Sequence, residues 1–189
     1  MEEDLVEYYS QERWDNWLAR LDDADLDDED ETSQLYLNLQ TDAAIAVAKV
    51  LSAYQEDDLS LEEAIDELED IRDIVLEEPS LENDEAMILI DAIQTSMLCI
   101  FVSIDRYLAD APIEPEPVDE RIEAAIEAEA SEHFDDALAH VAEIGAAIID
   151  GDRFDLAPRE DAEYGLVAEW LGGLDSLQEA LQGPKVVEE

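Results

Sequence analysis

One short segment, Met97–Val102, constrains the fold more than any other part of the chain, because every side chain in it is apolar. It lies inside a helix that the sequence predicts over residues 83–109. The polar stripe of this helix consists of Asp84, Asp91, Gln94 and Thr95. Leu98 and Val102 continue that stripe, so the segment is apolar around the whole helix. Such a helix must be enclosed on every side, and we expect it to lie at the centre of the fold or in an oligomer interface.

The longer apolar run around this segment, Ala86–Ile104, is close to the ~20 residues that a membrane-spanning helix needs. Its middle, however, holds Asp91 together with other polar residues, and a central Asp costs ~3 kcal/mol on insertion scales. Arg106 is the only cation that flanks it closely. We therefore expect a buried core helix and no membrane association.

The rest of the chain is helical in pattern as well, and no segment alternates apolar and polar residues for long enough to predict a strand. We predict an all-α fold, a six- or seven-helix bundle in which antiparallel helices surround the long apolar central helix. The predicted helices cover residues 10–21, 33–55, 61–78, 83–109, 118–149 and 158–182. The number of helices stays open, because residues 118–149 form either one long helix or a hairpin that breaks near Ser131–His133. The turn-like sequence SEHFDDAL favours the hairpin.

Several helix ends carry recognisable signals. Thr32 or Ser33 can cap the second helix, and Ser60 with Glu63 forms a capping box ahead of the third. Pro158 is a favourable first-turn residue for the last helix. The polar face of the second helix, opposite its apolar arc, holds Asn38, Thr41, Asp42, Lys49 and Ser52.

Two glycines, Gly172 and Gly173, lie inside the last predicted helix, where each costs ~1 kcal/mol relative to alanine. Either another backbone packs closely there, or the helix breaks and Ser176 with Glu179 starts it again. The sequence leaves both arrangements open.

The acidic run and the proline-rich stretch divide the chain into four parts. Residues 1–31 form an N-terminal tryptophan helix and an acidic linker, and residues 32–110 form a central three-helix unit. Prolines make residues 111–117 a stiff connection. Residues 118–189 form a C-terminal helical unit, which we expect to pack on the first to give one compact domain.

The charge of the chain is extreme. Asp and Glu number 55 against 9 Lys and Arg, so the formal net charge is −46, yet 47% of the residues are hydrophobic and follow helical spacing. That charge destabilises a compact state by self-repulsion in ordinary buffer, whereas at ~1 M salt the Debye length falls to roughly 3 Å and screens it. We interpret the chain as a cytoplasmic protein of an extremely halophilic archaeon.

The same composition excludes several classes of function. Nucleic-acid binding needs Lys and Arg to displace counterions from phosphates, so we expect no nucleic-acid partner. Anionic membrane surfaces are disfavoured for the same reason. The start MEEDLVEY carries no basic region before an apolar stretch, so we expect no secretory signal. The single cysteine, Cys99, allows no intramolecular disulfide and fits a reducing cytosol.

Few residues suggest chemistry, and the histidines are the first to consider. His133 and His140 are the only two in the chain. If one helix covers them, a single flank holds Glu129, His133, Asp136, His140 and Glu143. Two histidines and three carboxylates can hold a divalent transition metal, which would suit a metal-dependent enzyme. The spacing between the histidines is wide for one metal, however, and carboxylates are everywhere in this chain, so we interpret the flank as a solvated face.

The sequence does not match the other catalytic and binding motifs that we considered. The start of a calcium loop is mimicked by Asp23, Asp25 and Asp27. The loop then has Asp28 where glycine is needed and Gln34 where Glu is needed, so we reject it. Cys99 has no visible base, and we expect a buried structural thiol. No glycine-rich phosphate loop is present, so no constellation supports an enzyme and we expect no cofactor.

Two sets of residues are candidates for protein interfaces. Trp14 and Trp17 share a stripe on the short first helix, which either docks on the rest of the protein or anchors a partner, because Trp is enriched at the dominant positions of interfaces. Leu98 and Val102 extend a polar stripe that one chain would otherwise leave facing outward. We therefore expect a homo-oligomer, with a dimer favoured. Asp91 lies either on a solvent-facing stripe or in a buried polar network.

Four segments also resemble a known family. They are YSQERWDNWLARL, LYLNLQTDAAIAVAKVLSAY, DAIQTSMLCIFVSIDRYLAD and EYGLVAEWLGGLDSLQEAL. In this order, over nearly the whole chain, they resemble an archaeal family, mostly haloarchaeal, catalogued as domain of unknown function 2150. The resemblance implies a soluble archaeal protein and brings no activity, cofactor or catalytic residue.

Taken together, the sequence predicts a non-enzymatic cytoplasmic protein-interaction or scaffold protein that acts through helix faces, with an unknown protein partner. The first alternative is a metal-dependent enzyme that uses the flank of His133 and His140. The second is an acidic mimic of nucleic acid that occupies a basic protein.

Overall fold

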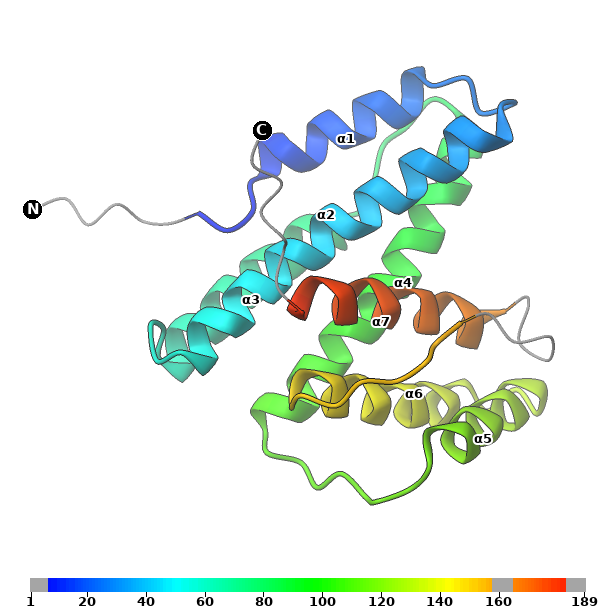
Figure 1. Ribbon diagram of the computed structural model, residues 1–189. Helices are drawn as coiled ribbons and strands as arrows, with labels where there is room; N and C mark the ends of the chain where they lie inside the picture. Colours follow the sequence, from blue (N-terminus) through cyan, green and yellow to red (C-terminus); the bar gives the residue numbers. More distant parts are fainter. Residues whose placement is uncertain (1–6, 158–164, 183–189) are drawn as a thin grey trace, which may run out of the picture. The chain divides into compact units, whose positions relative to one another are not determined.

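The computed structural model describes residues 7–157 and 165–182, which form seven α-helices and no strand (Figure 1). The prediction of an all-α fold with a long apolar helix is confirmed. The helices are α1 (Gln11–Asp23), α2 (Glu29–Gln55), α3 (Leu61–Val75), α4 (Asp84–Leu108), α5 (Val118–Ala130), α6 (Phe134–Ile149) and α7 (Leu166–Leu181).

The chain forms two compact units, Met1–Ile90 and Asp91–Glu189. The first contains α1, α2, α3 and the first turns of α4, and the second contains the remainder of α4 with α5, α6 and α7. The division lies inside α4 rather than at the proline-rich residues 111–117, because this long helix supplies apolar residues to both units. The acidic residues after α1 do not separate that helix from the first unit.

In the first unit, α2 and α3 lie side by side as an antiparallel pair (Figure 1). The predicted capping box is confirmed, since Ser60 N donates to Glu63 Oε2 at 2.8 Å and Glu63 N donates to Ser60 Oγ at 3.3 Å. The predicted cap of α2 is wrong. Asp28 caps this helix by accepting from the backbone N–H groups of Asp30 and Glu31. Aspartate is as good a cap as threonine, and the carboxylates that follow it favour a helix start inside the acidic run.

In the second unit, the predicted hairpin is confirmed, with α5 and α6 as neighbouring helices (Figure 1). Glu132 takes a left-handed conformation (φ 62°) after α5, and His133 N donates to Ala128 O at 2.8 Å to close the turn. The start that Pro158 predicts for the last helix lies outside the described residues. The described part of that helix begins at Leu166, after Gly165 with φ 132°.

Two glycines fix how closely α4 approaches its neighbours in the second unit. A Cβ on Gly173 of α7 would lie 2.8 Å from the backbone oxygen of Ser96 in α4, whereas a Cβ on Gly172 would meet nothing within 4 Å. A Cβ on Gly145 of α6 would collide with Ser103 of α4. Of the two arrangements that the sequence leaves open at Gly172–Gly173, the structure contains the close packing, at Gly173. The helix α7 continues through both glycines and does not start again at Ser176.

The two adjacent glycines make a matched test of this packing. Gly172→Ala should stabilise the protein by about 1 kcal/mol, because alanine is the better helix former and the site is open. Gly173→Ala should destabilise it by roughly 1–3 kcal/mol, because the added methyl group forces α7 away from Ser96. Urea unfolding in molar KCl measures both changes. Shifts of the same sign and size in the two variants would contradict the close approach.

Candidate interaction surfaces

The tryptophan helix α1 is anchored within the first unit. Ser10 caps it, since Arg13 N donates to Ser10 Oγ at 3.2 Å. Trp14 is only 1% exposed and Leu21 is fully buried, so one face of α1 belongs to the core of this unit. Trp17, one turn along, is half-buried.

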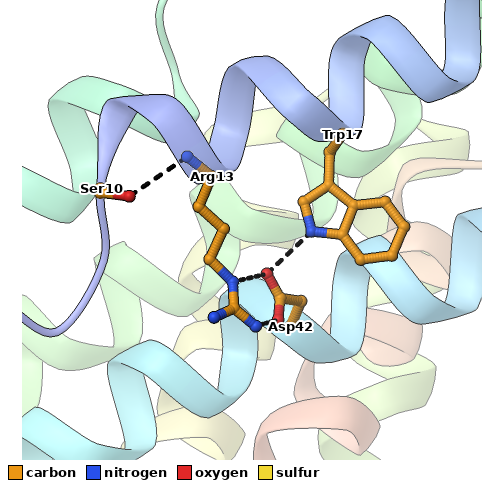
Figure 2. Close-up of polar contacts among 4 residues, drawn as sticks. All are labelled: Ser10, Arg13, Trp17 and Asp42. Atoms are coloured by element: carbon orange, nitrogen blue, oxygen red, sulfur yellow. Dashed lines mark hydrogen bonds and ion pairs between the residues drawn. The ribbon is translucent and has the colours of Figure 1, made fainter.

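A single carboxylate, Asp42 of α2, accepts hydrogen bonds from two side chains of α1 (Figure 2). Arg13 Nε donates to Asp42 Oδ2 at 2.8 Å, and a second guanidinium nitrogen of Arg13 bonds the other carboxylate oxygen. Trp17 Nε1 donates to Asp42 Oδ2 at 2.9 Å. The Asp42 side chain is 12% exposed, so this two-pronged pair is shielded from water on the Asp side. We call these three residues the Asp42 clamp.

The electrostatics of the Asp42 clamp keep its cation charged. The hydrogen bond to Asp42 is the main cause that raises the pKa of Arg13, with burial acting against it. Burial, followed by the negative charge of Asp42, raises the pKa of the neighbouring Tyr9 hydroxyl far above its ordinary value. Tyr9 therefore stays neutral beside the clamp, and the site carries one balanced ion pair.

Further contacts hold both ends of α1. Gln11 Nε2 donates to Glu77 Oε2 at 3.1 Å, close to the start of the helix. At its end, Asp22 Oδ1 accepts from the backbone N–H groups of Glu82 at 3.1 Å and Asn83 at 2.8 Å. Of the two arrangements that the sequence left open for the tryptophans, the structure contains the docked one. A role for them in binding a partner stays a prediction.

The stripe of α4 that contains Asp91, Leu98 and Val102 faces outward. Asp91 is exposed, and Thr95 Oγ1 donates to the Asp91 backbone oxygen at 2.8 Å, so the stripe faces solvent rather than a buried network. Leu98 and Val102 are half-buried, in contrast to the buried neighbours Met97, Cys99, Ile100 and Phe101. The segment 97–102 is thus enclosed except along this stripe.

By length and composition alone, α4 is the one helix among the described residues that could cross a membrane. About half of its most apolar window is buried inside the protein. The exposed carboxylate of Asp91 lies in that window, which is costly in a bilayer. The absence of a membrane partner stays a prediction.

The histidine flank is divided by the turn between α5 and α6. His133 precedes α6 and is exposed, Asp136 is exposed, and His140 is half-buried. Within the described ranges, no group of three or more His, Cys, Asp or Glu side chains is arranged to hold a metal ion. The metal-dependent enzyme stays an alternative that the arrangement of the described residues does not favour.

The two outer carboxylates of that flank have other contacts. Glu129 accepts from Leu166 N at 2.7 Å and from Val167 N at 3.2 Å, so it caps α7 from the end of α5. The positive end of the α7 dipole favours a carboxylate there. Glycine suits position 165 because side chains rarely adopt its φ of 132°, and a Cβ there would also displace the Glu129 carboxylate.

Glu143 of α6 lies at the centre of a partly buried ion-pair cluster. It pairs with Arg121 of α5, and with Arg106 of α4 at 3.2 Å. Arg121 is only 4% exposed and also donates to the backbone oxygen of Glu114 at 2.8 Å. Arg121 forms a further ion pair with Glu116, with 3.5 Å between the guanidinium nitrogen and the carboxylate oxygen. These contacts join three helices and the proline-rich connection within the second unit.

Cys99 is fully buried, as expected for a structural thiol. Burial raises the pKa of the Cys99 thiol to about 12, with a hydrogen bond to Ser103 acting weakly against it. A thiol that is neutral and shielded from water is a poor nucleophile.

The ion-pair cluster predicts an asymmetry between single and double variants. Arg121→Met should destabilise the protein by roughly 1.5–3 kcal/mol, because it removes the main partner of the partly buried Glu143 carboxylate, which keeps only Arg106. Arg121→Met/Glu143→Leu should recover part of that loss, because the charges then left without a partner, Arg106 and Glu116, are both partly exposed to solvent. Urea unfolding of both variants in molar KCl tests this, and a double variant as unstable as the single one would contradict the pairing.

Comparison with known proteins identifies a family. A family model described as an uncharacterised protein conserved in archaea, DUF2150, matches residues 7–189. No curated protein and no solved structure matches the chain.

Proposed function

The chain belongs to this archaeal family, and we propose that it is a non-enzymatic protein-interaction or scaffold protein that works in a salt-rich cytoplasm. It acts through helix faces, and it associates with a second copy or another protein through the outward stripe of α4 around Leu98 and Val102.

The observation that carries this proposal is the pair of half-buried apolar side chains on that stripe, Leu98 and Val102. Residues 92–104 contain no charged side chain, in a chain with a net charge of −46. Leu98 and Val102 are half-buried there, although burying such a side chain fully is worth ~1.5–3 kcal/mol. A partner that covers Leu98 and Val102 gains apolar contact, and this contact has to end before the exposed carboxylates of Asp91 and Asp105 at either end. Isologous dimers are the commonest way for copies of one chain to do so.

The distribution of charge supports the salt-rich setting. Burial, followed by the nearby charges of Asp70, Asp66 and Glu7, raises the pKa of Glu67. Asp175 has a raised pKa for the same kinds of cause, namely burial and then Glu179 and Asp155. Burial is the larger cause of both shifts, and the smaller contribution of the neighbouring carboxylates marks repulsion between like charges. Concentrated salt screens it.

The α4 stripe gives a direct test of association. Leu98→Glu should convert the oligomer into monomer in molar KCl, because it places a carboxylate at the contact. Phe134→Glu is the matched control, since it adds the same charge at an exposed apolar residue of the same unit and should leave the oligomer unchanged. Light scattering after size exclusion measures the mass. A wild-type protein that is already monomeric, or equal effects of the two variants, would contradict self-association through α4.

A further inference from the structure

We propose that residues 151–157 form a salt-dependent latch, which closes on α7 in concentrated KCl and opens locally as KCl is lowered. They follow α6 and lead toward α7 within the second unit (Figure 1). Opening exposes Leu156 of the latch, which is only 5% exposed in the closed state. The latch therefore couples the salt concentration to the exposure of an apolar side chain, and it does not depend on the association through the α4 stripe.

One side chain of α7, Gln178, fastens the latch by two hydrogen bonds. Phe154 N donates to Gln178 Oε1 at 2.8 Å, and Gln178 Nε2 donates to Phe154 O at 2.9 Å. Gln178 is 8% exposed, so its amide is shielded from water. A single side chain thus satisfies both backbone polar groups of Phe154, which water would otherwise have to bond.

Little else fastens this part of the chain. The start of the latch is held by α6, since Asp152 N donates to Ala147 O at 3.0 Å. Among the described residues, no further hydrogen bond and no ion pair joins residues 153–157 to the helices. A segment with few such contacts opens at a lower free energy than the whole fold. The latch can therefore open while α6 and α7 stay folded.

The hydrogen bonds that close the latch also bring carboxylates together. Asp175 lies one turn before Gln178 on α7 and is half-buried, and Asp155 follows Phe154 in the latch. Burial, and then the negative charges of Glu179 and Asp155, raises the pKa of Asp175. The closed state therefore places like charges near one another, one of them partly removed from water.

No cation offsets this charge in the part of the chain that the structure describes. Arg153 is the one Lys or Arg of the latch, and it is exposed and pairs with no described carboxylate. Salt screens the repulsion, because the Debye length falls from ~10 Å at ~0.1 M to ~3 Å at ~1 M. Concentrated KCl therefore favours the closed latch. Dilution favours the open one, in which Asp155 moves away from Asp175.

Hydrogen exchange of the Phe154 amide tests the latch, because this N–H donates to Gln178 only in the closed state. The full chain is measured by NMR in ~1 M KCl and at lower concentrations that leave its circular dichroism unchanged. Exchange should become roughly two- to fivefold faster at the lower concentrations, as expected when one or two like-charge pairs lose their screening. The amide of Leu174, which is buried within α7, should stay protected throughout.

Asp175→Asn should slow the exchange of the Phe154 amide at low KCl and remove most of its salt dependence, because it removes the charge at nearly constant size. Glu123→Gln is the matched control, since it removes one exposed carboxylate from α5 of the same unit and should leave the exchange unchanged. Gln178→Leu should make the exchange fast at every KCl concentration. The proposal is overturned if the Phe154 amide exchanges independently of KCl, if Gln178→Leu leaves it protected, or if Asp175→Asn and Glu123→Gln behave alike.

Discussion

Mutual repulsion of carboxylates is the constraint to which the rest of this structure responds. With 55 acidic residues and 9 cations, few positive charges are available, and their placement matters. Arg13 ties α1 to α2 through Asp42. Arg106 and Arg121 tie α4 and α5 to α6 through Glu143. The cations in these pairs therefore join helices to one another, which a surface ion pair within one helix would not do.

Some carboxylates stabilise the fold without a cation, by capping the N-terminal ends of helices. Asp28 caps α2, Glu63 completes the capping box of α3, and Glu129 caps α7 from another helix. Each lies where the helix dipole and the free N–H groups favour negative charge. Elsewhere the charge is a cost, as the raised pKa values of Glu67 and Asp175 indicate. The fold thus uses part of its acidity internally and leaves the remainder to be screened by the solvent.

The sequence predicts those features that local pattern determines. Apolar spacing gives the helices, the turn-like residues after α5 give the hairpin, and Gly173 in a helix indicates a close approach. The Asp42 clamp was missed, because Asp42 lies on a polar face that looks solvated and its partner is far away in sequence. Glu129 was missed for the same reason, since nothing local connects it with α7. In a chain this acidic, the informative signal is the position of the rare arginines, and each one is a reason to look for a specific carboxylate.

The dependence of unfolding on salt tests this account most directly. The free energy of unfolding by urea, followed by circular dichroism, should fall steeply at about pH 7 as KCl is lowered from ~1 M to ~0.1 M, because the Debye length grows. At ~0.1 M KCl it should be partly recovered at about pH 5. Glu67 and Asp175 have raised pKa values, so the folded state takes up more protons than the unfolded state and gains stability as the pH falls. A free energy of unfolding that does not change with KCl at either pH would show that the carboxylates are compensated within the protein, and would contradict the account.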